Sequence, residues 1–209
     1  VRLPYRSWLG LGLVLALAAC NPLSSFGNKP VSDYKLNPNP KQRYDITMTI
    51  ANAPGSFASM EGLVQYDVSN RQCLPPPDSN PGGYSAHMTR HVPFVLTRVS
   101  ETHYTGTVFA DLMLDEDYHG RGVCHWKLIQ ARVHMKATGA DGETLFIPSL
   151  PVEDLLSESA VTTYFWKGYY PRTDVENFPE SGDTSLDNVP ADKKGDFFTI
   201  SLTPKEVRP

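Results

Sequence analysis

Positive charge is scarce in this sequence, and so are the motifs that usually reveal a catalytic site. The 209 residues include 19 Lys and Arg against 23 Asp and Glu, without a basic stripe anywhere along the chain. A protein that binds nucleic acid needs such a stripe to neutralise phosphates, so a nucleic-acid partner is excluded. A mildly acidic protein of this kind is attracted, if at all, to a cationic partner.

The sequence also lacks a Gly-x-Ser-x-Gly elbow, the motif that presents the nucleophile in α/β-hydrolases. Asp115 and Asp117 are candidates for an acid–base pair in sugar cleavage, but neighbours on an exposed turn seldom keep the separation that this chemistry needs. We therefore predict no catalytic residue, no cofactor and no enzyme. A hydrolase with an unrecognised site remains the alternative.

The sequence has only one apolar run of about ten residues, and it lies near the start of the chain. Residues 8–17 are apolar except for two glycines, and Arg2 and Arg6 precede them. A transmembrane helix needs about 20 such residues, so this run is too short to span a bilayer. A basic start, a short apolar stretch and a small-residue exit are typical of a secretory signal peptide.

The four residues Leu17-Ala18-Ala19-Cys20 resemble the bacterial lipobox at every position. The resemblance implies that the thiol of Cys20 receives a diacylglycerol, that cleavage precedes it, and that the new amino group is acylated, for example with palmitate. Several acyl chains anchor a protein firmly to a membrane. Asn21 follows Cys20, and by the same resemblance this favours the outer membrane, with the protein facing the periplasm.

We expect three segments: a signal peptide over 1–19, a lipidated and flexible tether over 20–42, and a β-rich periplasmic domain over 43–209. The tether is rich in proline and asparagine and has too few large apolar residues to form a core. Cleavage would leave 17 basic against 23 acidic residues, a net charge of −6.

Two cysteines remain once Cys20 is assigned to the anchor. The bacterial periplasm is oxidising, so we predict that the two remaining cysteines, Cys73 and Cys124, form a disulfide. Two free buried thiols are the alternative, because the sequence does not show whether the two backbone segments approach each other.

Alternation of apolar and polar residues predicts half-buried strands, most clearly over 43–51. Further strands are predicted over 60–68, 92–100, 103–114, 123–138, 143–150, 162–170 and 196–204. We interpret 91–148 as a four-stranded antiparallel meander, expect a bulge in 123–138, and expect the terminal strand to pair with a central one. The fold class is all-β, a single antiparallel β-sandwich with long polar loops and one disulfide.

The densest polar group lies in "LDEDYHGRGVCHW", residues 114–126. We predict that it binds a partner through Asp115, Glu116, Asp117, Tyr118 and His119. The segment imitates the first half of a calcium loop, but Trp126 stands where a bidentate Glu is needed. Cys124 and His125 are neighbours on a strand and point to opposite faces, which argues against zinc. We therefore predict no metal.

The simplest interpretation of the same segment is a charged hairpin turn. Gly120 and Gly122 would then supply positive φ angles. His119 and His125 would form hydrogen bonds at the loop and at the sheet surface.

A second candidate is "TTYFWKGYYP", residues 162–171, which holds five aromatic residues. Successive rings on a strand alternate faces, so some of them must lie outside the core. We predict Trp166, Tyr169 and Tyr170 as binding residues, because Tyr and Trp are favoured anchors of interfaces. A sandwich core with ordinary surface rings is the alternative.

The mature chain is similar to small periplasmic lipoproteins found beside secreted antibacterial effectors. The resemblance lies in "RYDITMTIANAPGSF", an early cysteine in a proline-rich loop, and "DEDYHGRGVCHW". Proteins of that kind act as immunity proteins that plug the active site of a toxin. The resemblance implies binding of a protein, and the alternative is a structural or assembly lipoprotein of the outer membrane.

Overall fold

The computed structural model describes residues 34–76 and 88–208. By its internal contacts the chain divides into two units, Val1–Val31 and Ser32–Pro209, and every described residue belongs to the second. The predicted signal peptide, the lipobox and Cys20 therefore lie outside the described residues. No helix within the described ranges is long and apolar enough to cross a membrane.

The described residues form eleven strands, one short α-helix and three 3₁₀-helices. The strands are β1 (Arg43–Ala51), β2 (Ser59–Val68), β3 (Thr89–Phe94), β4 (Leu96–Arg98), β5 (His103–Phe109), β6 (Trp126–Lys136), β7 (Leu145–Phe146), β8 (Ser149–Pro151), β9 (Val161–Trp166), β10 (Pro179–Glu180) and β11 (Phe197–Val207). The helices are η1 (Arg71–Cys73), α1 (Val152–Leu156), η2 (Lys167–Tyr169) and η3 (Ala191–Asp196).

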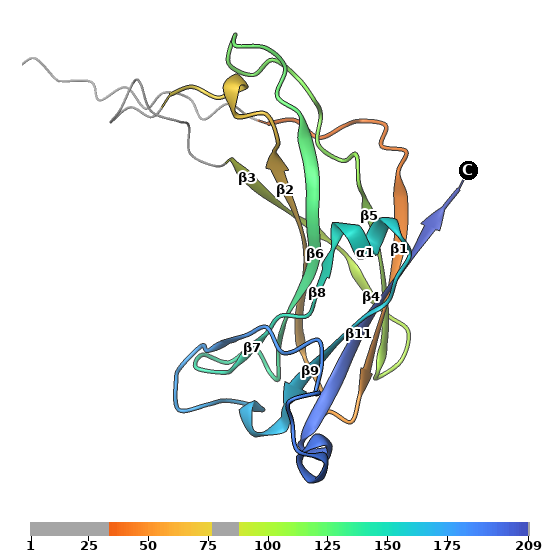
Figure 1. The fold of residues 1–209 in the computed structure, drawn as a ribbon, viewed down its shortest axis with the longest axis vertical. Helices are drawn as coiled ribbons and strands as arrows, with labels where there is room; N and C mark the ends of the chain where they lie inside the picture. The colour runs from red at the N-terminus through yellow and green to blue at the C-terminus, as the bar shows by residue number, and fades with distance from the viewer. Residues whose placement is uncertain (1–33, 77–87, 209) are drawn as a thin grey trace, which may run out of the picture. The chain divides into compact units, whose positions relative to one another are not determined.

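Two sheets pack against each other, which confirms the predicted all-β sandwich (Figure 1). The first sheet has the order β4-β5-β1-β11-β9. The second has the order β10-β7-β6-β2-β3, and β8 also pairs with β6. Pairing is antiparallel except between β10 and β7. The terminal strand β11 lies between β1 and β9, so the expectation that it pairs with a central strand is confirmed.

The predicted meander over 91–148 is wrong. β5 pairs with β1 and β4 in the first sheet, whereas β6 pairs with β2 in the second. The residues between β5 and β6 therefore carry the chain from one sheet to the other. Alternation shows which face of a strand is buried, but it does not show which strand lies beside it.

The core lies between the sheets and follows the alternation of the sequence. In β1 the buried side chains are Tyr44, Ile46, Met48 and Ile50, and in β11 they are Phe198, Ile200, Leu202 and Pro204. Four rings then join the two sheets, because Phe146 of the second sheet contacts Phe165 and Phe198 of the first and also Phe57. Such edge-to-face pairs add to the free energy gained by burying apolar area.

The expected bulge in β6 is present. The pairing of β6 with β2 shifts register between Gln65 and Tyr66, so that Ile129 has no partner on β2. Leu128 and Ala131 are buried on either side of it. One extra residue thus changes which positions of β6 face the core.

The strand predicted over 162–170 is too long, because β9 ends at Trp166 and η2 follows. The indole ring of Trp166 lies over Gly168, where an added Cβ would approach the ring to 2.6 Å. The backbone turns at this point, and Tyr170 then packs edge-on against Phe57.

The tether predicted over 20–42 does not extend to residue 42. Leu36 forms a β-bridge with Met113, and the backbone N–H of Asn37 donates to the carbonyl of Leu112. Residues 34–42 therefore lie on the domain and contribute to the site described next.

Candidate functional site

The disulfide predicted from the cysteine count is present. Cys73 and Cys124 are bonded, with their Cα atoms 5.3 Å apart, and both residues are buried. The bond fastens η1, which follows β2, to the segment that enters β6. The alternative of two free thiols is therefore wrong.

We call residues 110–125, which join the two sheets, the Asp-rich loop. Its first and middle carboxylates bind neighbouring backbone. Asp111 accepts hydrogen bonds from the backbone N–H groups of Lys41 and Gln42 at 2.9 and 3.0 Å. Asp115 accepts one from the backbone N–H of Trp126 at 2.9 Å and contacts Nδ1 of His125 at 2.8 Å. The loop is thus held to the start of β1 and to β6.

Asp117 organises the outer turn of the Asp-rich loop. Its carboxylate accepts from the backbone N–H groups of Arg121 at 3.0 Å and His119 at 3.3 Å. Burial alone would raise the pKa of Asp117, but backbone donors from residues 119–122 outweigh it and lower the pKa. Gly120 and Gly122 have φ angles of 67° and 96°, which confirms the positive φ expected of this turn. A carboxylate held in this way is a fixed part of the backbone framework.

Glu116 is paired with a residue from the predicted tether. Lys35 donates to its carboxylate at 2.8 Å, and this hydrogen bond, with the charge behind it, raises the pKa of Lys35. Tyr118 donates its hydroxyl to the carbonyl of Leu114 at 2.5 Å. The acidic side chains of the loop are therefore engaged within the protein, and the charge of Glu116 is paired with that of Lys35.

Aromatic rings from distant parts of the chain meet beneath this loop. Tyr34 contacts Tyr118 and Trp126 edge-on, with ring centroids 4.9 and 5.0 Å apart. Its hydroxyl lies 3.1 Å from Nε2 of His119, and the guanidinium of Arg90 lies 5.2 Å from its ring centre. We call these five residues the Tyr34 cluster. It fixes the loop against β3 and β6.

Sequence reasoning found Tyr118 and His119 but missed Tyr34, Arg90 and Trp126. Tyr34 lies in a polar segment, so nothing in its neighbourhood marks it as packed. The available signal was weak: Tyr34 and Leu36 are two large side chains at alternate positions in a segment with few others. The hydrogen bonds predicted for His119 and His125 are confirmed.

The second predicted group lies elsewhere, and the structure divides it. Trp166 is the last residue of β9 and Tyr169 is the last of η2. This end of β9 lies at the opposite end of the strands from the Asp-rich loop (Figure 1). The rings of Trp166 and Tyr169 are perpendicular, with centroids 4.9 Å apart. Tyr170 instead points inwards and donates to the carbonyl of Ser56 at 2.6 Å. Tyr170 is therefore partly buried against the core, while Trp166 is 45% exposed.

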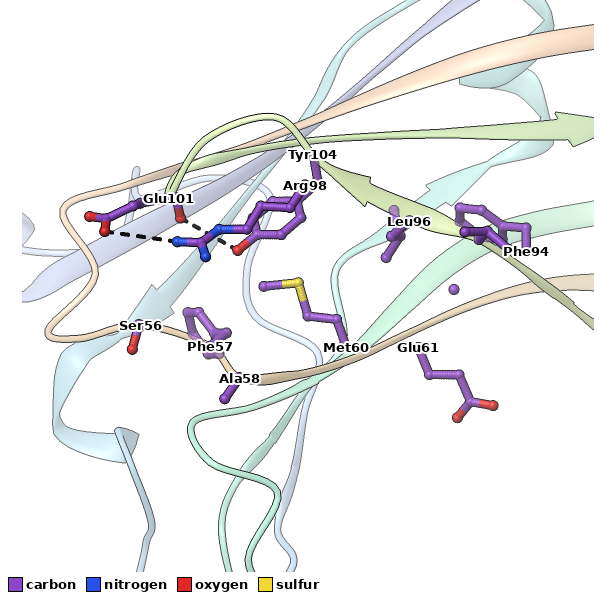
Figure 2. A pocket seen from close by; sticks show the side chains of 12 residues that line it. Ser56, Phe57, Ala58, Met60, Glu61, Phe94, Leu96, Arg98, Glu101 and Tyr104 are labelled. Atoms are coloured by element: carbon purple, nitrogen blue, oxygen red, sulfur yellow. Dashed lines mark hydrogen bonds and ion pairs between the residues drawn. The ribbon is translucent and has the colours of Figure 1, made fainter.

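A cavity of about 950 Å³ opens where the chain passes from β3 to β4 (Figure 2). Phe57, Met60 and Tyr104 point into it. Its only ion pair among the lining residues joins Arg98 to Glu101 at 3.8 Å and is exposed, so it contributes little to stability. Glu61 points away from the other side chains in Figure 2. The lining thus combines aromatic and apolar side chains with the exposed pair of Arg98 and Glu101.

Within residues 34–76 and 88–208, no three His, Cys, Asp or Glu side chains converge in a way that would hold a metal ion. We take the Asp-rich loop and the Tyr34 cluster as the candidate site, because backbone hydrogen bonds, an ion pair, ring contacts and the disulfide hold them together. The chain matches no family model, no curated protein and no solved structure.

Proposed function

We propose that this protein is a lipid-anchored binding protein of the periplasm, held to the outer membrane through Cys20, that captures another protein with its Asp-rich loop. The specific form that we propose is neutralisation of a secreted antibacterial toxin. The partner has a cleft into which the loop inserts.

The disulfide supports an extracytoplasmic address. Structural disulfides form and persist in oxidising compartments such as the bacterial periplasm and are rare where thiols are kept reduced. The bond between Cys73 and Cys124 is buried and lies at the base of the loop. A binding loop that depends on such a bond would function only in an oxidising compartment.

The observation that carries the proposal is that the loop is organised before any partner arrives. Its shape is fixed by the disulfide, by the backbone donors around Asp117 and by the rings around Tyr34. Binding costs conformational entropy when a flexible loop must be ordered, and a loop that is already ordered avoids that cost. Rigid loops of this kind suit tight insertion into a partner's cleft.

The loop's outer surface has the chemistry of an interface. Arg121 and Val123 are exposed beside the turn, and Val123 is 44% exposed. Asp115 and Asp117 flank them and favour a partner cleft with positive charge. Two buried polar atoms nearby, Oε2 of Glu116 and Nε1 of Trp126, have no hydrogen-bond partner among the described residues. Departures from full satisfaction are expected at functional rather than purely structural sites.

The test is affinity capture with the full chain, expressed in its membrane-anchored form, from envelope extracts and from secreted fractions of competing bacteria. Val123→Lys places a positive charge at the exposed tip, which a cationic cleft would repel, while leaving the disulfide and the Tyr34 cluster intact. We expect the native chain to recover a partner and this variant to lose at least about 90% of it, a tenfold or larger fall in affinity. Mass spectrometry of the bait reports whether Cys20 carries acyl chains.

The matched control is Val175→Lys, which adds the same charge at an exposed valine outside the loop. It should capture the partner as the native chain does. The proposal is wrong if the tip variant and the control capture equally, or if the chain recovers no partner and hydrolyses ester or glycan substrates instead.

A further inference from the structure

A second groove, which the loop does not reach, lies on the outer face of β9 and β11. We call it the Trp166 groove. Its volume is about 560 Å³, within the range of sites for small molecules and side chains. The lining residues that matter here are Tyr164, Trp166, Tyr169, Glu180, Asp183 and Asp196.

Strand alternation places three rings on this face. Phe165 of β9 is buried in the core, so its neighbours Tyr164 and Trp166 point outwards. Phe197 of β11 is paired directly with Trp166 across the two strands. The ring of Tyr169 stands perpendicular to that of Trp166. The result is a corner of aromatic faces that is open on one side.

The groove is built to hold this corner in place. An added Cβ at Gly168 would meet three atoms of the Trp166 ring between 2.6 and 2.7 Å, so only glycine lets the ring lie flat there. Lys167 donates to the carbonyl of Gly195 at 2.8 Å and ties η2 to η3. The ring therefore has a fixed position on one face and is 45% exposed.

Three carboxylates also line the groove. Asp183 is held beside β9 by two backbone hydrogen bonds to Tyr164, of 2.7 and 2.9 Å. Within the described residues, the structure records no hydrogen bond or ion pair for the carboxylates of Asp183 and Asp196. With Glu180 the lining holds three carboxylates, against one cation, Lys193.

We propose that the Trp166 groove binds the guanidinium or ammonium group of a basic peptide side chain. Aromatic faces attract cations through their quadrupole, most strongly for Trp, and carboxylates beside them add direct charge pairing. Three negative groups against one positive group select a cationic ligand over a neutral one. This site is independent of the lipid anchor and of the partner of the Asp-rich loop.

The test is a titration of the full chain, in nonionic detergent, with Nα-acetyl-arginine amide and with Nα-acetyl-citrulline amide, followed by calorimetry and by tryptophan fluorescence. The two ligands have nearly the same shape, and only the first carries a cation. We expect the arginine compound to bind at least about tenfold more tightly. Asp183→Asn combined with Asp196→Asn should remove most of that preference, and Trp166→Leu should abolish both binding and the fluorescence change.

The matched control is Asp187→Asn, because Asp187 is exposed on the same segment but does not line the groove. It should leave the affinity unchanged, and all variants should keep the native unfolding temperature. Equal binding of the two ligands would overturn the proposal. So would binding of a neutral glycan such as chitotriose in place of the arginine compound, or no binding of any probe. None of these results bears on the Asp-rich loop, whose test uses a different variant and readout.

Discussion

Glu143 is one of the few buried acidic residues, and its carboxylate closes the turn between β6 and β7. It accepts hydrogen bonds from the backbone N–H groups of Thr138 and Gly139, at 2.9 and 3.0 Å, and from the hydroxyl of Thr138 at 2.8 Å. Burial alone would raise the pKa of Glu143, but these donors outweigh it and lower the pKa. The charged form of Glu143 is thus part of the native structure.

The residue-scale prediction is that Glu143→Gln lowers the free energy of unfolding by about 1–3 kcal/mol at neutral pH, because one oxygen acceptor is replaced by an N–H₂ group facing donors. The pKa of the native carboxyl lies below its ordinary value of 4.5. Its stabilisation is therefore complete above pH 4.5 and is lost as the pH falls through the lower, folded pKa. The difference in the free energy of unfolding between the native chain and the variant should therefore become smaller in that acidic range.

Urea unfolding at several pH values measures both effects. Asp141→Asn is the control, since Asp141 is exposed in the same turn. If the difference in the free energy of unfolding between the native chain and Glu143→Gln stayed constant down to strongly acidic pH, the charge of Glu143 would not stabilise the fold.

At the scale of elements, the disulfide and the Asp-rich loop form one unit. Cys73 and Cys124 are separated by 51 residues, and closing a loop of that length stabilises the folded chain by about 4 kcal/mol in the chain-entropy model. We predict that Cys73→Ala combined with Cys124→Ala lowers the free energy of unfolding by about that amount. Capture of the loop's partner should also weaken under conditions where the variant is still folded.

The measurement is urea unfolding with and without a reductant. Reduction should lower the stability of the native chain towards that of the variant and leave the variant unchanged. If the reductant destabilised both proteins equally, its effect would not come from this bond.

The sequence predicted the strands with local alternation and missed contacts that depend on distant residues. Tyr44 to Ile50 alternate without interruption, so β1 was predicted with its correct bounds and buried face. Tyr34 and His119, by contrast, are 85 residues apart, and the sequence around each of them gives no sign of the contact. The candidate loop could be located by its density of polar groups, but the partners of each carboxylate could not. The meander failed for the same reason, since pairing between strands is not a local property.

For the whole molecule, adhesion between the two sheets depends on a few large side chains. Phe146 lies fully buried in the second sheet and touches Phe165 and Phe198 of the first. We predict that Phe146→Ala lowers the free energy of unfolding by about 3–5 kcal/mol, because it removes a ring from the junction and leaves a cavity. Such a loss is a large share of the stability of an ordinary domain.

Urea unfolding of this variant is compared with that of Val175→Ala, a truncation at a side chain that is 60% exposed. The control should change stability by less than about 0.5 kcal/mol. A loss below about 1 kcal/mol for Phe146→Ala would show that the sheets adhere through other contacts.

The edge strands of both sheets are poorly suited to pairing with a strand from another chain. The outer strands are β4 and β10, of three and two residues, β3, which contains Pro93, and β9, whose free side is occupied at Tyr164 by Asp183. Short, proline-bearing or covered edges prevent other chains from adding as further strands. Within the described residues, the edges of both sheets therefore disfavour the addition of a strand from a second copy where many copies share one surface.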